Sequence, residues 1–167
     1  MFIELNDTGG SQDDSSKWEI RVEYIDSVYF AYTSDLMAEM AEAVGKSGDA
    51  KKYTDWGKRI RTFFNKNYVN GDGSLAVNTQ TAYALALFVD MLPPEKRVPA
   101  ARHLVRLIED NDNLMSTGFL GTRPLLPVLT AAGHHDLAVQ LLQSRRYPSW
   151  GFEIVNGATT IWERWNS

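Results

Sequence analysis

The end of the chain places a carboxylate in an aromatic setting that could do chemistry. Glu163 stands between Trp162 and Trp165, with Arg164 beside it. Flat aromatic faces suit the apolar faces of sugar rings, and a carboxylate held between them could accept a proton from water. A carboxylate of this kind is one of the two catalytic groups that glycoside hydrolysis ordinarily needs, the second being another carboxyl group. The sequence therefore predicts a sugar site here and raises the question of a partner for Glu163.

Three nearby residues are further candidates for contacting a sugar. Trp150 offers another flat face, Thr160 has a hydroxyl that could hydrogen-bond the sugar, and Arg164 could contact the substrate or orient Glu163. Each has an ordinary structural alternative, because buried aromatic residues are more often core and Thr160 could cap the following segment. Glu163 itself could pair with Arg164 or cap a helix.

The tail also resembles a known family. Residues 157–165, together with the segment Tyr-Pro-Ser-Trp-Gly-Phe at 147–152, are similar to the bacterial alpha-L-rhamnosidases. The likeness continues through 117–122 and 80–87, and it covers roughly residues 20 to 167. The resemblance implies a catalytic domain built as a toroid of six helical hairpins. It also implies hydrolysis of terminal alpha-L-rhamnosyl groups with inversion.

By this resemblance Glu163 is the general base that deprotonates the attacking water. The family's general acid lies in an upstream acidic segment, with Asp-Glu-Arg followed by Gly-Trp and Gly-Asp, and no stretch of this sequence resembles that segment. Asp26, Asp136 and Glu153 are the carboxylates that could be nominated instead, but Asp136 looks like a helix-start residue and the other two belong to no motif. Without an acid the leaving alkoxide departs unprotonated, so we expect the isolated chain to be inactive.

Composition limits the possible partners and cofactors. The formal net charge is -4 and the basic residues are interspersed with acidic ones, which argues against nucleic acid. There is no cysteine, and the three histidines lack the spacing of a metal site, so we expect neither a metal nor a cofactor. No apolar run approaches the roughly 18 residues of a membrane span, and no signal peptide is evident. The cell compartment stays open, with the cytoplasm as the default.

The apolar pattern predicts helices that follow one another in pairs. An inner helix that is apolar nearly all round alternates with an amphipathic outer one, which is how a helical toroid or solenoid buries its core. Residues 152–155 alternate weakly, enough for a short extended piece at most. The three expected hairpins are 25–44 with 49–64, 79–92 with 94–108, and 124–132 with 136–143.

The chain is long enough for one domain or part of one. Residues 1–16 end in a small, polar run and are expected to be a flexible leader or severed linker, with the domain over 17–167. We predict an all-α fold whose hairpins form about half of an (α/α)6 toroid. The apolar faces at its ends are expected to bind the missing N-terminal half or a second copy of the chain.

Two other functions stay open. A carbohydrate-binding or assembly module could have kept the aromatic tail and lost the acid. Another six-hairpin glycosidase could act on a different sugar, because the pocket walls that choose the sugar lie partly upstream. Under the favoured hypothesis, of an alpha-L-rhamnosidase, the expected substrate is a rhamnosyl glycoside.

Overall fold

The computed structural model describes residues 15–166, and the regular structure in that range is helical. Residues 1–14 of the expected leader lie outside the described residues, and the first helix begins at Ser15. The helices are α1 (Ser15–Ala43), α2 (Ser47–Tyr68), α3 (Gln80–Phe88), α4 (Pro94–Glu109), α5 (Phe119–Ala131), α6 (His135–Gln143) and α7 (Trp150–Val155).

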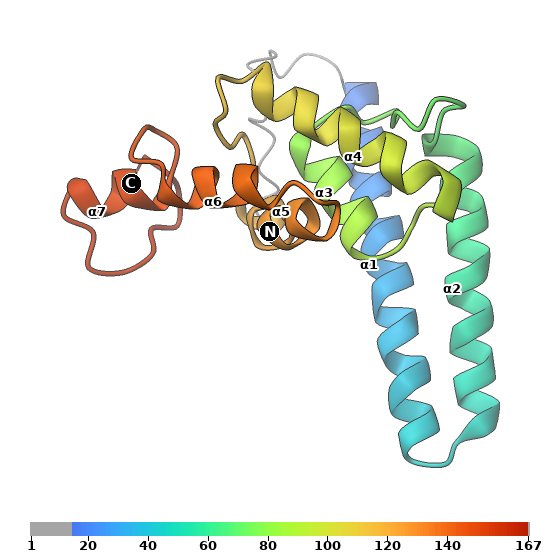
Figure 1. Ribbon diagram of the computed structural model, residues 1–167. Helices are drawn as coiled ribbons and strands as arrows, with labels where there is room; N and C mark the ends of the chain where they lie inside the picture. The colour runs from blue at the N-terminus through green and yellow to red at the C-terminus, as the bar shows by residue number, and fades with distance from the viewer. Residues whose placement is uncertain (1–14, 167) are drawn as a thin grey trace.

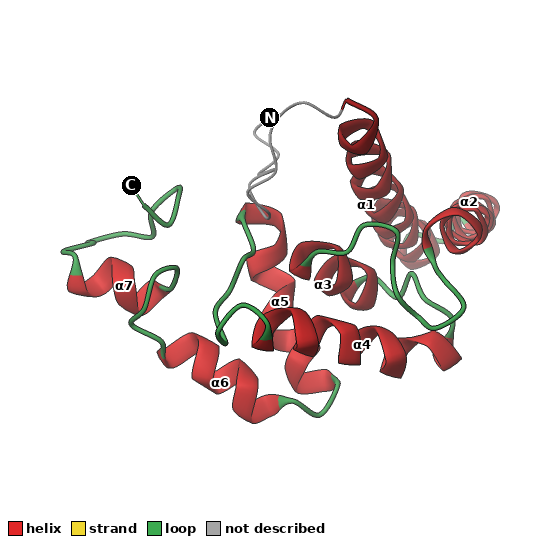
Figure 2. Cartoon of the chain, turned by 90° about the horizontal axis from the view of Figure 1, so that it is seen from above, coloured by secondary structure: helices red, strands yellow, loops and turns green. Residues whose placement is uncertain are grey.

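Successive helices pair into three hairpins (Figure 1). Helix α1 packs on α2, α3 on α4, and α5 on α6. Seen from above, α1, α3 and α5 lie in a row and α2, α4 and α6 lie outside them (Figure 2). Helix α3 contacts both α1 and α5, so the row is a continuous inner layer. The predicted all-α architecture of paired inner and outer helices is confirmed.

The core is centred on α3, which is buried on nearly every side. Small alanines along this helix let its neighbours approach closely, and Tyr83 is fully buried among them. The Tyr24 hydroxyl of α1 donates to the Ala82 carbonyl at 2.8 Å. The Tyr24 ring also packs on Phe64 of α2, with centroids 4.8 Å apart. One buried tyrosine thus joins the first hairpin to the second.

Arg61 of α2 makes a second connection between these hairpins. Its guanidinium donates to both carboxylate oxygens of Asp35 on α1, at 3.1 and 2.5 Å. It also donates to the carbonyls of Val89 and Asp90, each at 3.0 Å. The chain reverses at Asp90, where φ is 54°. This reversal ends α3 at Phe88, before the end of the expected 79–92 helix.

Two expectations about the second half of the chain are wrong. The third inner helix begins at Phe119, although the sequence pattern placed its start at Pro124. Proline inside a helix removes a donor, but here the first turn is held by Thr122, whose amide and hydroxyl both bond the Gly118 carbonyl, at 3.0 and 2.8 Å. The segment 152–155 is helical, not extended. Ser149 caps α7 by accepting a hydrogen bond from the Phe152 amide at 3.0 Å.

Candidate active site at the end of the chain

The tail is a short helix followed by a loop that returns across it. Helix α7 ends at Val155, and Gly157 follows with φ 89°, a conformation that suits glycine. The Ala158 amide then donates to the Glu153 carbonyl at 3.0 Å, as in a helix C-cap. The remaining residues, up to Asn166, form the loop that carries Glu163.

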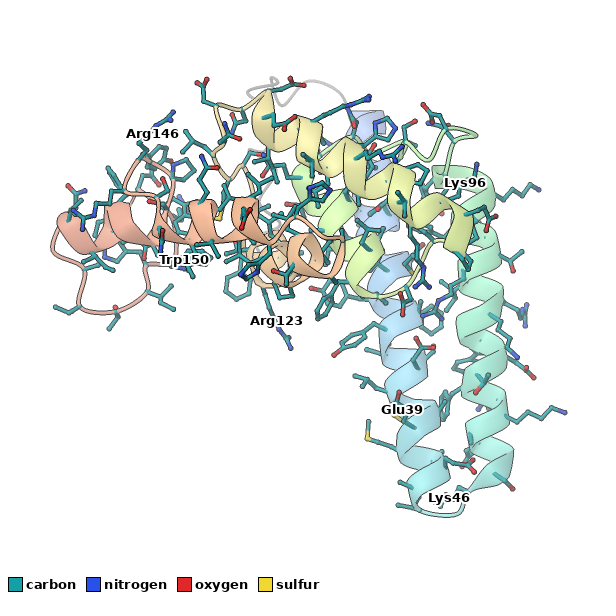
Figure 3. The ribbon with its side chains drawn as sticks, viewed as in Figure 1. Glu39, Lys46, Lys96, Arg123, Arg146 and Trp150 are labelled. Carbon is teal, nitrogen blue, oxygen red and sulfur yellow. The ribbon has the colours of Figure 1, made fainter. Side chains whose placement is uncertain are left out.

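Two tryptophans of the tail pack on each other and on the core. Trp150, which begins α7 (Figure 3), meets Trp165 edge to face, with ring centroids 5.6 Å apart and an interplanar angle of 78°. Both are half-buried against the hydrophobic core. The Trp165 indole N–H donates to the Thr117 carbonyl at 2.9 Å. The end of the chain is therefore anchored to the loop that precedes α5.

Gln80 fixes that preceding loop from within the core. Its side chain is 1 % exposed, and its amide nitrogen donates to the carbonyls of Leu107 and Leu114, at 3.2 and 3.1 Å. Its amide oxygen accepts from the Ser116 backbone N–H at 2.9 Å. Since Thr117 follows directly in the chain, the residue bonded by Gln80 is the neighbour of the residue bonded by Trp165.

The residues around Glu163 lie in different surroundings. Glu163, Arg164 and Thr160 are exposed, whereas Trp162 is half-buried. The Glu163 carboxylate is thus open to water, which a general base for a hydrolytic reaction requires. The structure brings Trp150 and Trp165 into contact with each other, and Glu163 lies on the loop beside them.

A second carboxylate of the tail is buried. Glu153 of α7 is 3 % exposed, and its Oε2 accepts from the Trp162 backbone N–H at 3.5 Å. Sequence reasoning named Glu153 only as a carboxylate without a motif, and it gave no role to Gln80 or Thr117. Two signals in the sequence could have indicated buried polar residues. One is a glutamate between the apolar residues Phe152 and Ile154, and the other is a glutamine at the start of an apolar helix.

Neither a metal centre nor a membrane span is found in the described part of the chain. Among the side chains that the structure describes, residues 21–166, there is no group of three or more His, Cys, Asp or Glu placed to hold a metal ion. Among the helices of that same range, none is long and apolar enough to cross a membrane.

We expect Gln80→Leu to destabilise the protein by about 2 to 4 kcal/mol. The substitution leaves the part-buried Leu107 carbonyl and Ser116 amide without the partner that Gln80 supplies, whereas the Leu114 carbonyl keeps the Asn111 side-chain amide at 3.0 Å. Each unsatisfied group costs about 1 to 3 kcal/mol unless water reaches it. Urea unfolding followed by circular dichroism measures the loss. Gln140→Leu, at an exposed position on α6, is the matched control and should change stability by less than about 0.5 kcal/mol. Equal losses in the two variants would contradict the anchoring role of Gln80.

Comparison with known proteins gives the family. The sequence pattern of the bacterial alpha-L-rhamnosidase 6 hairpin glycosidase domain matches residues 5–167. The alpha-L-rhamnosidase of Streptomyces avermitilis is 51 % identical over 143 residues, which are 86 % of this chain and 14 % of that protein. The alpha-L-rhamnosidase of Formosa agariphila is 42 % identical over 144 residues, 86 % of this chain and 16 % of that protein.

Solved structures agree with this assignment. The crystal structure of the Streptomyces avermitilis alpha-L-rhamnosidase complexed with L-rhamnose superposes with a TM-score of 0.83, covering 86 % of this chain and 14 % of that chain. The native enzyme from Aspergillus terreus gives a TM-score of 0.80 at 35 % identity, covering 84 % of this chain and 16 % of that one. The three hairpins α1–α2, α3–α4 and α5–α6 confirm the prediction of about half of a six-hairpin toroid. The chain belongs to the bacterial alpha-L-rhamnosidases, as part of their six-hairpin glycosidase domain.

Proposed function

We propose that this chain supplies the general-base side of an active site that hydrolyses terminal alpha-L-rhamnosyl groups with inversion. The observation that carries the proposal is the exposed carboxylate of Glu163 on a loop whose end is anchored by Trp165 to Thr117. Its relative from Streptomyces avermitilis has been solved in complex with L-rhamnose, which supports the choice of sugar. The fixed loop holds a base where both water and a sugar can reach it.

In the proposed reaction Glu163 accepts a proton from a water molecule as the water oxygen attacks the anomeric carbon. The bond from that carbon to the leaving oxygen breaks on the opposite face, and a separate acid protonates the departing oxygen. In inverting glycosidases the two carboxyl groups stand about 6.5 to 9.5 Å apart, to leave room for the water. Glu153 is buried, and Asp26 and Asp136 lie on α1 and α6, outside the tail. Because no stretch of this sequence resembles the family's acid segment either, we assign the acid to another part of the domain.

Among the aromatic candidates, Trp162 is the favoured sugar platform. Part of the ring surface of Trp150 and Trp165 is taken up by the core and by their edge-to-face contact with each other. Trp162 is half-buried and directly precedes Glu163. A ring there could stack on the apolar face of the rhamnosyl group, while the exposed Thr160 and Arg164 offer polar groups to its hydroxyls.

An apolar groove on the first hairpin is the proposed docking face for the rest of the domain. It has a volume of about 1110 Å³ and is lined by side chains of α1 and α2. Phe30, Trp56 and Phe63 in this groove are 51, 37 and 44 % exposed. Three hairpins are present here and the family's domain has six, so we assign the groove to a neighbouring helical hairpin of that domain rather than to a second copy of this chain.

An assay of rhamnoside hydrolysis tests the proposed function. We expect no turnover by the chain alone, and turnover after it is mixed with a polypeptide that carries the preceding part of the domain and its acid. The acid contributes about 10² to 10⁴ fold to the rate, which makes the two cases distinguishable. A mixture that forms a complex and binds rhamnose without hydrolysing rhamnosides would favour a carbohydrate-binding module instead.

The same mixture tests the groove. Phe30→Glu should weaken binding of the preceding part at least about tenfold, because it places a charge in an apolar contact. Val98→Glu, at a position on α4 that is 62 % exposed and outside the groove lining, is the matched control. Titration of the labelled chain gives both affinities. If Phe30→Glu instead abolishes self-association of the chain and leaves this binding unchanged, the groove takes a second copy.

A further inference from the structure

Glu153 is a buried carboxylate whose hydrogen bond is made with the loop of the candidate base. Its side chain is 3 % exposed, and a carboxylate removed from water is unfavourable unless it is hydrogen-bonded. Its Oε2 lies 3.5 Å from the Trp162 backbone nitrogen, which donates to it. Trp162 directly precedes Glu163, so this contact acts one residue from the candidate base.

The main chain of Glu153 holds the other end of the same loop. The Ala158 amide donates to the Glu153 carbonyl at 3.0 Å. The loop from Ala158 to Trp162 therefore begins on the backbone of Glu153 and returns to its side chain. One residue closes this loop at both ends.

The helix that carries Glu153 is itself closely seated. Ser149 caps its first turn, and Trp150 packs against Trp165. Gly151 approaches the chain before the helix so closely that a Cβ there would lie 2.2 Å from the Ser144 carbonyl oxygen. Because Glu153 belongs to this fixed helix, its hydrogen bond to the Trp162 amide fixes the loop relative to the helix.

Glu163 lies between two anchors of different kinds. On one side the Trp162 amide is held by Glu153, and on the other the Trp165 indole is held by the Thr117 carbonyl. A general base acts only when its carboxylate is correctly placed relative to the water and the sugar, and small displacements reduce turnover strongly. A carboxylate as buried as Glu153 cannot touch a substrate in this chain, so its contribution acts through the loop.

We propose that Glu153 is a positioning residue that fixes the 158–162 loop, and with it the general base Glu163, through its hydrogen bond to the Trp162 amide. This inference rests on the proposed function for its catalytic consequence. The arrangement of the loop itself does not depend on the reaction, and it can be measured without turnover.

Amide hydrogen exchange of the 167-residue chain, read by NMR, tests the loop contact. We expect the Trp162 amide to be protected in the wild type, to stay within about threefold of that rate in Glu153→Gln, and to exchange at least about tenfold faster in Glu153→Leu. Glutamine keeps an acceptor oxygen at this position and leucine does not. Glu39→Leu, at an exposed glutamate of α1 (Figure 3), is the matched control and should leave Trp162 unchanged.

Internal markers separate loss of the contact from loss of the helix. The Ala158 amide bonds the main chain of Glu153, so it should remain protected in Glu153→Leu if α7 persists. Faster exchange at Trp162 with Ala158 still protected supports the proposal. Unchanged exchange at Trp162 in Glu153→Leu overturns it, and so does a Trp162 amide that is unprotected in the wild type.

Kinetics of the assembled enzyme test the catalytic consequence. Glu153→Leu should lower kcat at least about tenfold with KM within about threefold, and Glu153→Gln should restore kcat to near the wild-type value. Equal kcat in the wild type and Glu153→Leu, with Trp162 exchange accelerated, would overturn the positioning role. An assembled wild type without any turnover would instead count against the proposed function, while the exchange measurement still decides the loop contact.

Discussion

Glu163→Gln is expected to lower kcat of the assembled enzyme at least about a hundredfold. The amide has nearly the size of the carboxylate but cannot accept a proton from water, so the attack on the anomeric carbon loses its base. Because Glu163 is exposed and lies on an anchored loop, the substitution should not disturb the fold. Binding of rhamnose in the ground state should change little, so the effect should appear in kcat rather than in KM. Steady-state hydrolysis of an aryl rhamnoside measures both parameters.

Azide separates loss of the base from loss of geometry. Azide is a nucleophile that needs no deprotonation, and in a base-deleted inverting enzyme it can attack the anomeric carbon directly, which would give the beta-linked rhamnosyl azide. Glu109→Gln, at an exposed position at the end of α4, is the matched control and should keep full turnover. Near-wild-type hydrolysis by Glu163→Gln would falsify the general-base assignment.

The helical framework could be predicted because its signals are local. Gly45, which follows the α1 stripe with φ 73°, and Pro94 at the start of α4 mark helix boundaries that depend on backbone conformation alone. The apolar character of α3 likewise predicted a helix surrounded on most sides, and it is. Such features need no knowledge of distant parts of the chain.

Contacts between distant segments could not be predicted in the same way. Gln80 bonds Ser116, and Trp165 bonds Thr117, across 36 and 48 residues of sequence. Hydrogen bonds of this kind depend on how hairpins pack. A sequence does not show whether a glutamine or tryptophan has such a partner in the fold.

The prediction of an extended segment at 152–155 was wrong for a local reason. Weak alternation in so short a segment carries less weight than the capping hydrogen bond of Ser149.

The candidate site likewise combines features that are local in the sequence with contacts that only the fold creates. The sequence grouped Trp162, Glu163 and Trp165 by their spacing, yet the structure gives them different surroundings. Trp165 is used to anchor the tail, whereas Glu163 is open to solvent. The Trp162 amide, next to Glu163, donates to the side chain of Glu153, a residue that carries no motif of its own. Proximity in sequence suggested the candidate base, and only the fold shows the hydrogen bonds on either side of it.

Gly121→Ala is expected to destabilise the protein by about 2 kcal/mol or more, although alanine is the better helix former by about 1 kcal/mol. Gly121 lies in α5 where that helix touches α3, and a Cβ there would lie 2.4 Å from the Thr81 hydroxyl oxygen and 3.0 Å from the Thr81 Cα. The second of these contacts is with backbone, so a change of rotamer cannot relieve it. The two helices would have to separate within the inner layer.

Gly48→Ala is the matched control, because Gly48 lies in α2 with no atom within 4 Å of the position that its Cβ would take. There the same substitution should stabilise the protein by about 0.4 to 1 kcal/mol. Urea unfolding followed by circular dichroism should therefore give shifts of opposite sign. Adding Thr81→Ala to Gly121→Ala should recover part of the loss, since it removes the hydroxyl and leaves the contacts with Cβ and Cα of residue 81, at 2.9 and 3.0 Å. Stabilisation by both glycine substitutions would mean that α3 and α5 do not pack this closely. The loop before α5, whose Thr117 carbonyl binds the Trp165 indole, would then lack the support of that packing.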